Sequence, residues 1–380
     1  MNQAQIAAFL ERLKAEGCYR ERKRPEKALM DLSSNDYLGL SFDAKLRQSF
    51  MEERSDALPA FSGTGSPLLS GFSAETELLE RELTRFMGRP CLTLNSGFDT
   101  NAGVLEALSD RDTLILADKL AHASLITGMQ LARGRCLRFA HNDMEHLKTL
   151  FNRYAPAFKT VIIVTEALFS MDGDYAPLRE LASFKRAHAD KVLLYVDEAH
   201  SFFIYGKGRG LCAQLGLLED VDFMVGTFGK ALGGCGAFIS TSQLYLDYLI
   251  NMLRPYIFST ALPPVVWAWD RHVLARAELF EERRERLFGL IERCQRSLEP
   301  LRIPVRSPIL SLLTGSPLRA IALSRSLRKA GFVARPIRYP TVPKGRERVR
   351  VTLNATLSDE DIARLIQAIR AFNDEGRLCA

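Results

Sequence analysis

Lys230 is the residue whose surroundings point most directly to chemistry. Four glycines lie within residues 226–234 around it, and the apolar segments 221–225 and 236–239 on either side are typical of short strands. Because glycine tolerates positive φ and close approach, such a turn would hold the lysine through its backbone. A lysine held in this way can form a Schiff base once its amine is deprotonated. A lone Gly-Lys pair also occurs in ordinary turns, so the assignment depends on the rest of the chain.

Other reactive side chains follow predicted strands. Asp197 comes directly after the strand expected at 192–196, and His200 lies three residues later. His122 and Ser170 follow two other predicted strands. In an open α/β sheet, ligands bind beyond the carboxyl ends of the strands, so these side chains are expected to meet at one edge.

A phosphate site is expected at the turn Ser96-Gly97-Phe98. This turn lies between a strand predicted at 91–94 and a helix predicted from about residue 100. Backbone N–H groups and the dipole at a helix N-terminus bind phosphate. The turn therefore predicts an anion site close to the start of that helix.

Together these residues suit pyridoxal 5′-phosphate. Lys230 would bind the cofactor covalently, and Asp197 would pair with the pyridine nitrogen, which makes the ring an electron sink. His200 would hydrogen-bond the ring hydroxyl, and His122 would stack on the ring face. The remaining expected cofactor contacts are Ser96, Gly97, Phe98, Ser170 and Thr227.

Each of these residues alone also has an ordinary structural role. A carboxylate at a strand end often caps the next helix, and a single histidine often only packs. The joint spacing favours the cofactor, because Asp197 and His200 lie about thirty residues before Lys230 and about a hundred after the phosphate turn. Residues 197–200 also spell the acidic motif of some helicases, but no Walker A loop precedes them, which argues against an ATPase.

Alternating strands and helices must position this site. Apolar strands are predicted at 91–94, 113–117, 136–139, 160–164, 192–196 and 223–226, with helices between most of them. This pattern predicts an α/β fold with a mostly parallel sheet that is covered on both faces. After about residue 250 a smaller α+β region follows, whose last helix starts with a capping box at Ser358 and Asp361. We expect an N-terminal arm at 1–45, a large α/β domain at 46–245 and a small α+β domain at 246–380.

Composition narrows the function classes. The 380 residues carry 51 Lys and Arg against 45 Asp and Glu, a net charge of +6, which favours an anionic substrate and not nucleic acid. The basic run at 20–24 is interrupted by an acid and is interpreted as a solvated face. Seven scattered cysteines without C-x-x-C spacing argue against disulfides and zinc and fit a reducing cytosol. A signal peptide and a membrane span are not expected, so we predict a cytoplasmic chain without a membrane partner or a metal.

A longer series of motifs runs through nearly the whole chain. In order, they are residues 34–39, 69–71, 95–98, 122–125, 141–143, 169–174, 196–201, 225–234, 258–264 and 337–345. In this order they resemble the α-oxoamine synthases, which are fold-type I pyridoxal-phosphate enzymes that condense an amino acid with an acyl thioester and release carbon dioxide. The resemblance implies a homodimer.

The resemblance also implies roles for individual residues. Lys230 would remove and return the proton at the α-carbon, and His122 would polarise the thioester carbonyl. Asp197 would remain the partner of the cofactor ring. The implied substrate contacts are Arg350 and Asn35 for the amino acid carboxylate, Arg20 for a carboxylate on the acyl chain, and Thr341.

Within the family, residues 138–143, the Pro-Thr-Val-Pro loop at 340–343 and the short chain favour a member of biotin biosynthesis. Such a member joins L-alanine to a pimeloyl thioester carried by acyl carrier protein or coenzyme A. Pro67, Tyr339 and Thr356 depart from the usual family residues and bear on the acyl chain. A sister synthase that uses glycine with acetyl-CoA or succinyl-CoA is one alternative. A catalytically silent homologue that acts as a regulatory partner is another.

Overall fold

The structure is a computed structural model, which describes residues 2–22, 24, 28–54, 57–374, 376 and 378–379. Contacts divide the chain into two compact units. Unit 1 comprises Met1–Tyr37, Met171–Gly173 and Glu285–Ala380, and unit 2 comprises Leu38–Ser170 and Asp174–Arg284. The limits of these units differ from the domain boundaries expected near residues 45 and 245. Those domain boundaries stay a prediction.

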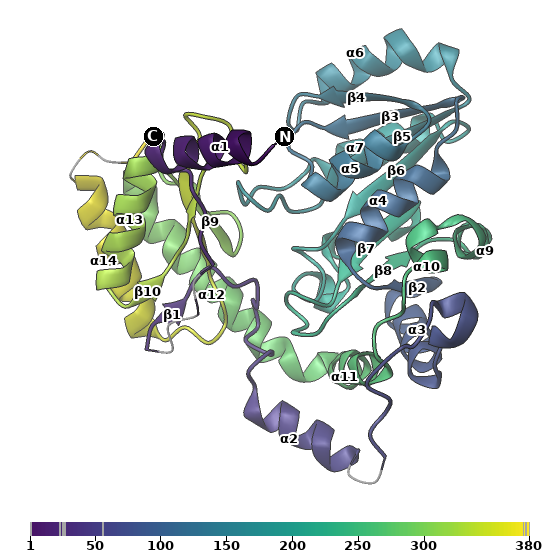
Figure 1. The fold of residues 1–380 in the computed structure, drawn as a ribbon, viewed down its shortest axis with the longest axis horizontal. Helices are drawn as coiled ribbons and strands as arrows, with labels where there is room; N and C mark the ends of the chain where they lie inside the picture. The colour runs from purple at the N-terminus through teal and green to yellow at the C-terminus, as the bar shows by residue number, and fades with distance from the viewer. Residues whose placement is uncertain are drawn as a thin grey trace. The chain divides into compact units, whose positions relative to one another are not determined.

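Unit 2 contains a seven-stranded sheet with the order β2-β8-β7-β6-β5-β3-β4 (Figure 1). The neighbours from β4 to β7 pair in parallel, and β8 runs antiparallel to both β7 and β2. This arrangement confirms the predicted α/β class with a mostly parallel sheet. The strands are β2 (Cys91–Leu94), β3 (Thr113–Asp118), β4 (Arg135–Phe139), β5 (Thr160–Glu166), β6 (Val192–Asp197), β7 (Phe223–Thr227) and β8 (Ala237–Ser240).

Burial explains why these strands are apolar along their whole length. Every residue of β3 is buried, and β5 is buried from its second residue onward. Leu105 and Leu125 pack with strand residues such as Ile115 and Val225 in one core cluster. Strands covered on both faces read as continuous apolar runs, which is the pattern that the sequence shows.

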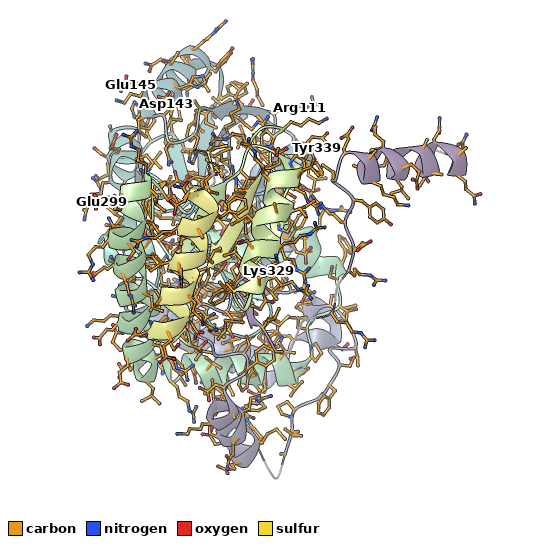
Figure 2. The ribbon with its side chains drawn as sticks, turned by 90° about the vertical axis from the view of Figure 1, so that its left-hand side faces the viewer. Arg111, Asp143, Glu145, Glu299, Lys329 and Tyr339 are labelled. Carbon is orange, nitrogen blue, oxygen red and sulfur yellow. The ribbon has the colours of Figure 1, made fainter. Side chains whose placement is uncertain are left out.

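Helices surround this sheet. After the helix Pro264–Leu274, a 3₁₀ turn follows at Ala277–Phe280. In α6 the N-cap Asp143 and the first-turn Glu145 favour the helix start (Figure 2). The helices of unit 2 are α2 (Ala44–Glu53), α3 (Ala74–Met87), α4 (Gly97–Leu108), α5 (Ala123–Leu131), α6 (Met144–Tyr154), α7 (Leu178–Ala187), α8 (Leu211–Gln214), α9 (Gln243–Met252), α10 (Arg254–Phe258), α11 (Pro264–Leu274) and the start of α12 (Glu281–Leu298).

Unit 1 is a smaller α+β structure, as the sequence predicts. Its three-stranded antiparallel sheet has the order β11-β12-β9, and a separate parallel pair joins β1 to β10. The capping box expected at the last helix is present, since Ser358 N donates to Asp361 Oδ2 and Asp361 N donates to Ser358 Oγ, both at 3.0 Å. The elements are α1 (Gln3–Ala15), β1 (Met30–Asp31), β9 (Ile309–Leu313), α13 (Pro317–Lys329), β10 (Phe332–Val333), β11 (Pro336–Ile337), β12 (Arg348–Thr352) and α14 (Asp359–Asp374).

The N-terminal helix α1 differs from the other helices because none of its residues is buried. Asn2 and Gln5 form a capping box at its start. Among the helices that the structure describes, none is long and apolar enough to cross a membrane.

Candidate active site

The turn between β7 and β8 holds Lys230 through backbone hydrogen bonds. Phe228 N donates to the Gly236 carbonyl at 3.0 Å, and the Thr227 hydroxyl donates to the same carbonyl at 2.9 Å. Gly233 N donates to the Lys230 carbonyl at 3.0 Å, and its φ of +74° favours glycine. The sequence predicts such a turn between two strands, and the structure contains it.

A cavity of about 180 Å³ lies beside Lys230; we call it the lysine cavity. It is formed at the carboxyl ends of β5, β6 and β7 and at the N-termini of α4 and α5. Seven of the nine residues expected at the cofactor line it, whereas Ser96 and Ser170 do not. The lining residues are Gly97, Phe98, Asn101, His122, Ser124, Glu166, Asp197, Ala199, His200, Thr227 and Lys230.

Two hydrogen bonds fix the buried carboxylate of Asp197. Asn101 Nδ2 donates to its Oδ2 at 2.6 Å, and Ala199 N donates to its Oδ1 at 2.8 Å. Asn101 is itself held by the hydroxyl of Tyr195, which donates to Asn101 Oδ1 at 2.8 Å. Asp197 therefore faces the lysine cavity in one orientation.

The same network reaches His122. Asn101 Nδ2 also donates to Ser124 Oγ at 2.9 Å, and Ser124 Oγ lies 2.8 Å from His122 Nδ1. Ser124 N donates to His122 Nδ1 at 3.3 Å, so these contacts assign Nδ1 as an acceptor and place the proton on Nε2. Burial of the ring lowers the pKa of His122 below 6.5, the negative charge of Asp197 opposes this shift, and the charge of Lys230 adds to it. His122 is thus a neutral imidazole that can donate from Nε2.

The start of α4 adjoins the lysine turn. A Cβ atom on Gly97 would lie 3.9 Å from Thr227 Cβ, which puts the helix N-terminus next to Thr227. The hydroxyl of Ser96 caps the helix, accepting from Asp99 N at 3.1 Å and donating to Asp99 Oδ2 at 2.7 Å. A helix N-terminus beside a threonine hydroxyl suits a phosphate group. The phosphate contacts of Gly97, Phe98, Thr227 and Ser96 stay predictions.

Glu166 is a residue of the lysine cavity that the sequence analysis missed. β5 continues two residues beyond its predicted end, to Glu166, which pairs in register with Asp197. The side chain is buried, and its Oε1 has no hydrogen-bond partner among the described residues. Burial, and then the charge of Asp197, raise the pKa of Glu166 to about 8. At neutral pH this carboxyl group is mainly protonated.

Three observations indicate that the lysine cavity suits pyridoxal phosphate. A lysine and a buried carboxylate of fixed orientation face the same space. A helix N-terminus at one wall offers N–H groups to an anion. The buried Glu166 Oε1 lacks a partner, and a ligand in the cavity would supply one.

The family called "Aminotransferase class I and II" matches residues 27–369. The chain belongs to this family. An 8-amino-7-oxononanoate synthase of Haemophilus ducreyi is 40% identical to the chain over 352 residues, which cover 90% of this chain and 91% of that protein.

Solved structures agree with this membership of the aminotransferase class I and II family. The 8-amino-7-oxononanoate synthase of Francisella tularensis is 27% identical and has a TM-score of 0.77, with 92% of this chain and 99% of that chain covered. The serine palmitoyltransferase of Sphingomonas wittichii is 26% identical and has a TM-score of 0.87, with 99% and 98% covered. A structure of SPT with a PLP internal aldimine is 25% identical and also has a TM-score of 0.87, with 98% and 97% covered. These findings confirm the predicted fold and the resemblance to the synthases.

The residues implied for the amino acid carboxylate lie together in unit 1. Arg350 donates to Asn35 Oδ1 and, at 3.3 Å, to Thr352 Oγ1. The Nε atom of Arg350 is buried and has no hydrogen-bond partner among the described residues. Burial raises the pKa of the neighbouring Tyr37 to about 12, while the positive charge of Arg350 and a hydrogen bond with it act to lower that pKa. The Nε–H of Arg350 is therefore an unused donor within the described residues.

Arg20 and Thr341 contact each other, since Arg20 Nη2 donates to Thr341 Oγ1 at 2.6 Å. Within the basic run at 20–24, Lys23 lies outside the described residues. Arg20, Thr341, Asn35 and Arg350 belong to unit 1, and Lys230 belongs to unit 2. The substrate roles of these four residues stay predictions.

Two further residues, Asn101 and Ser124, were missed although the sequence holds a signal for each. Asn101 is a polar residue among the buried positions of α4. Ser124 lies inside the motif at 122–125. Glu166 could have been found as a charged residue that ends an apolar strand.

Proposed function

We propose that this chain condenses L-alanine with a pimeloyl thioester, releases carbon dioxide and forms 8-amino-7-oxononanoate, a step of biotin biosynthesis. The observation that carries the proposal is the lysine cavity, where Lys230, Asp197 and His122 meet in a chain that is 40% identical to a synthase of that name.

The cofactor is pyridoxal 5′-phosphate. Lys230 Nζ would bind it covalently, Asp197 would pair with its ring nitrogen and His200 with its ring hydroxyl. When bound, it supplies an electron sink for the negative charge that develops at the α-carbon of alanine. The N-terminus of α4, where Gly97 adjoins Thr227, would hold its phosphate.

Lys230 moves the proton of the reaction. Its Nζ takes the proton from the α-carbon of alanine and returns one after carbon dioxide leaves. The backbone of the glycine turn fixes where the lysine side chain begins, which keeps the amine within reach of the cavity.

His122 is the donor for the second substrate. Its Nε2–H, the only N–H of the neutral ring, would donate to the carbonyl oxygen of the thioester, where negative charge develops as the new carbon–carbon bond forms. Arg350 and Asn35 hold the carboxylate of alanine, and the unpaired Arg350 Nε–H adds one donor. We further expect a cytoplasmic homodimer.

A decarboxylation assay on the purified, cofactor-loaded chain tests the function. Alanine, glycine and serine are each paired with pimeloyl-CoA, a pimeloyl carrier protein, acetyl-CoA, succinyl-CoA and palmitoyl-CoA. We expect the highest kcat/KM for alanine with a pimeloyl thioester. A preference for glycine with acetyl-CoA or succinyl-CoA would assign a sister synthase. A coloured, cofactor-bound chain that turns over no pair would assign a silent homologue.

A further inference from the structure

Helix α11 contacts the lysine turn, that is, residues 226–236, through two side chains. Trp269 Nε1 donates to the Gly233 carbonyl at 3.1 Å, and Cys235 N donates to Asp270 Oδ1 at 3.2 Å. Neither Trp269 nor Asp270 lines the lysine cavity, and the proposed reaction assigns them no task. All of these residues belong to unit 2.

The residues that α11 holds also hold Lys230. Gly233 N donates to the Lys230 carbonyl at 3.0 Å, and the carbonyl of the same glycine accepts from Trp269. Gly234 N donates to the Phe228 carbonyl at 2.9 Å and closes the turn around the lysine. Two hydrogen bonds through one glycine therefore connect Trp269 to the backbone of Lys230.

The carboxyl group of Asp270 occupies the space that a side chain at position 234 would need. A Cβ atom on Gly234 would lie 1.7 Å from Asp270 Oδ1, far inside the contact distance of two atoms. Gly233 has a φ of +74°, but Gly234 does not have a positive φ, so backbone freedom does not explain the glycine there. The close approach of Asp270 explains it.

The stability of α11 does not explain Asp270. The residue is fully buried in the helix, and its Oδ2 has no hydrogen-bond partner among the described residues. Aspartate is a poor helix former, and burial of a polar group without a partner costs free energy. Burial raises the pKa of Asp270 well above its ordinary value, and the hydrogen bond from Cys235 N opposes this shift. The carboxyl group is therefore protonated at neutral pH and accepts from Cys235 N as a neutral group.

The donor of Trp269 is fixed by a neighbouring ring. The ring of Phe50 in α2 lies edge-on to the ring of Trp269, with 5.4 Å between the centroids. Such a contact stabilises one orientation of the indole, so Nε1 stays directed at the Gly233 carbonyl.

We infer that α11 supports the lysine turn, and that Trp269 and Asp270 are positioning residues that place the Lys230 amine for proton transfer. The inference rests on the proposed function, in which Lys230 moves the proton at the α-carbon. Both residues act through the backbone of the turn, because neither lines the lysine cavity. A small misplacement of a reacting group lowers a rate steeply, so loss of this support should slow proton transfer first.

Three variants of α11 test the support. Asp270→Ala removes the acceptor of Cys235 N, and Trp269→Phe removes the donor to Gly233 but keeps an aromatic ring. Asp270→Asn keeps the shape, an acceptor oxygen and a neutral charge.

Arg271→Gln is the matched control on the same helix. In the described part of the chain, the guanidinium group of Arg271 bonds to Glu75 and Glu82 of α3 and not to the lysine turn. Thermal unfolding of every variant shows how much stability each one loses, and only the variants that face the turn should also lose proton transfer.

Exchange of the α-proton of alanine for solvent deuterium, followed by NMR without an acyl donor, measures the step assigned to Lys230. On the cofactor-loaded chain, Asp270→Ala and Trp269→Phe should each lower this rate by about tenfold, because each leaves a polar group of the turn unpaired. Asp270→Asn and Arg271→Gln should stay within about threefold of the wild type. KM for pimeloyl-CoA should stay within about twofold in all four, since the loss falls on proton transfer and not on binding of the thioester.

Wild-type exchange in Asp270→Ala or in Trp269→Phe would overturn the role of that residue. A loss in Arg271→Gln equal to theirs would overturn the inference, because it would indicate a general effect of α11 on folding. A loss in Asp270→Asn as large as in Asp270→Ala would overturn the role of Asp270 as a neutral acceptor.

A second-site test uses the space at Gly234. Gly234→Ala places a methyl group on Asp270 Oδ1 and should lower proton exchange below that of Asp270→Ala. Gly234→Ala combined with Asp270→Ala removes the overlap and should exchange faster than Gly234→Ala alone, or fold where the single variant does not. An unaffected Gly234→Ala chain, or a double variant that does no better than Gly234→Ala, would overturn the inference.

The outcomes separate this inference from the proposed function. A wild type that exchanges the α-proton but condenses alanine with no thioester would overturn only the proposed function. A wild type that condenses alanine while all four variants of α11 exchange at its rate would overturn only the support. The visible circular dichroism of the lysine-bound cofactor reports its orientation and should change in Asp270→Ala and Trp269→Phe alone, so it tests the support even in a chain without turnover.

Discussion

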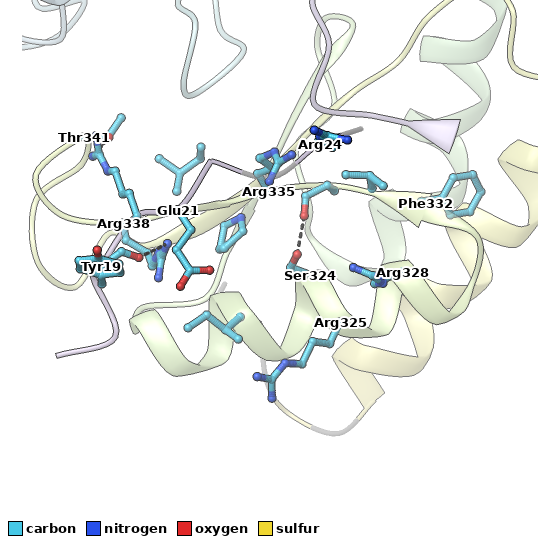
Figure 3. Close-up of a pocket in the computed structure, with 16 residues that line it drawn as sticks. Tyr19, Glu21, Arg24, Ser324, Arg325, Arg328, Phe332, Arg335, Arg338 and Thr341 are labelled. Atoms are coloured by element: carbon cyan, nitrogen blue, oxygen red, sulfur yellow. Dashed lines mark hydrogen bonds between the residues drawn. The ribbon is translucent and has the colours of Figure 1, made fainter. Parts of the chain in front are cut away.

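The lysine cavity of unit 2 is built on the opposite principle to a cavity of unit 1 that we call the arginine pocket (Figure 3). Six arginines line this pocket: Arg20, Arg24, Arg325, Arg328, Arg335 and Arg338. In the lysine cavity the reactive groups are held by short hydrogen bonds, as Asp197 is by Asn101 and Ala199. In the arginine pocket most of the arginines are exposed, and two of them reach only neutral oxygens. The difference separates two tasks: bond making requires fixed angles between groups, whereas attraction of an anionic group requires charge density. The predictions below test that separation, from the largest expected effect to the smallest.

Removal of the reactive amine should have the largest effect. Lys230→Ala should lower turnover by at least about a thousandfold and abolish the visible absorbance of the bound cofactor, because both the covalent link and the base are lost. Absorbance spectra and the decarboxylation assay measure this. The exposed Lys119, changed to alanine in the same unit, is the matched control and should behave as the wild type. Normal turnover in the Lys230 variant would refute the assignment.

Substitution of Asn101, which connects Asp197 to Ser124 by hydrogen bonds, should have the second largest effect. Asn101→Ala removes the donor to Asp197 and to Ser124 and leaves the Tyr195 hydroxyl without its acceptor. We expect kcat to fall by about ten- to a hundredfold, since a hydrogen bond to a charged group is worth about 1.5–3 kcal/mol. Tyr195→Phe, which removes only the outermost bond, should cost less. An unchanged kcat for the Asn101 variant would show that Asp197 needs no such support.

The titration of Glu166 should produce a smaller effect that depends on pH. Its folded pKa of about 8 lies above its ordinary value of 4.5, so the native state binds the proton more tightly than the unfolded state. The stability that this contributes is present below pH 4.5 and is lost as the pH rises through about 8. Cofactor-free wild type should therefore lose thermal stability relative to Glu166→Gln over this range.

Thermal unfolding of the two cofactor-free proteins between pH 4.5 and pH 9 gives the comparison. The difference in Tm between them should widen as the pH rises. A constant difference across this range would show that Glu166 does not titrate there in the folded chain.

Salt should have the smallest effect and should act on the arginine pocket alone. Raising ionic strength screens exposed charges, so KM for pimeloyl-CoA should rise a few-fold between about 0.05 and 0.5 M salt while kcat stays within twofold. The Arg325→Gln, Arg328→Gln variant should show a flatter dependence. A kcat that falls as steeply as KM rises would show that salt also acts on the lysine cavity.

The sequence predicts the lysine cavity well because its parts follow strand ends. Lys230, Asp197 and His122 each come directly after or close to an apolar strand, and parallel strands bring such positions to one edge. Asn101 was missed because a helix side chain reaches the site only through a hydrogen bond that periodicity does not show. Glu166 was missed because the predicted strand ended at residue 164, although the apolar run leads directly to it.

The arginine pocket lies beyond what sequence patterns reveal. Arg20 and Arg338 are 318 positions apart, and only the folding of unit 1 brings their segments to one cavity. The run at 20–24 was therefore interpreted from its own charges as a solvated face. Its relation to α13 depends on long-range contacts, which no local pattern reports.

The pairing of Glu166 with Asp197 across β5 and β6 limits how this sequence can change in length. Side chains alternate between the two faces of a strand, so one residue inserted within β5 would turn Glu166 to the opposite face and away from Asp197. The same holds for Asp197 and an insertion within β6. Alignment gaps among relatives that keep this chemistry should therefore avoid both strands and fall in the connections between them, such as residues 167–177.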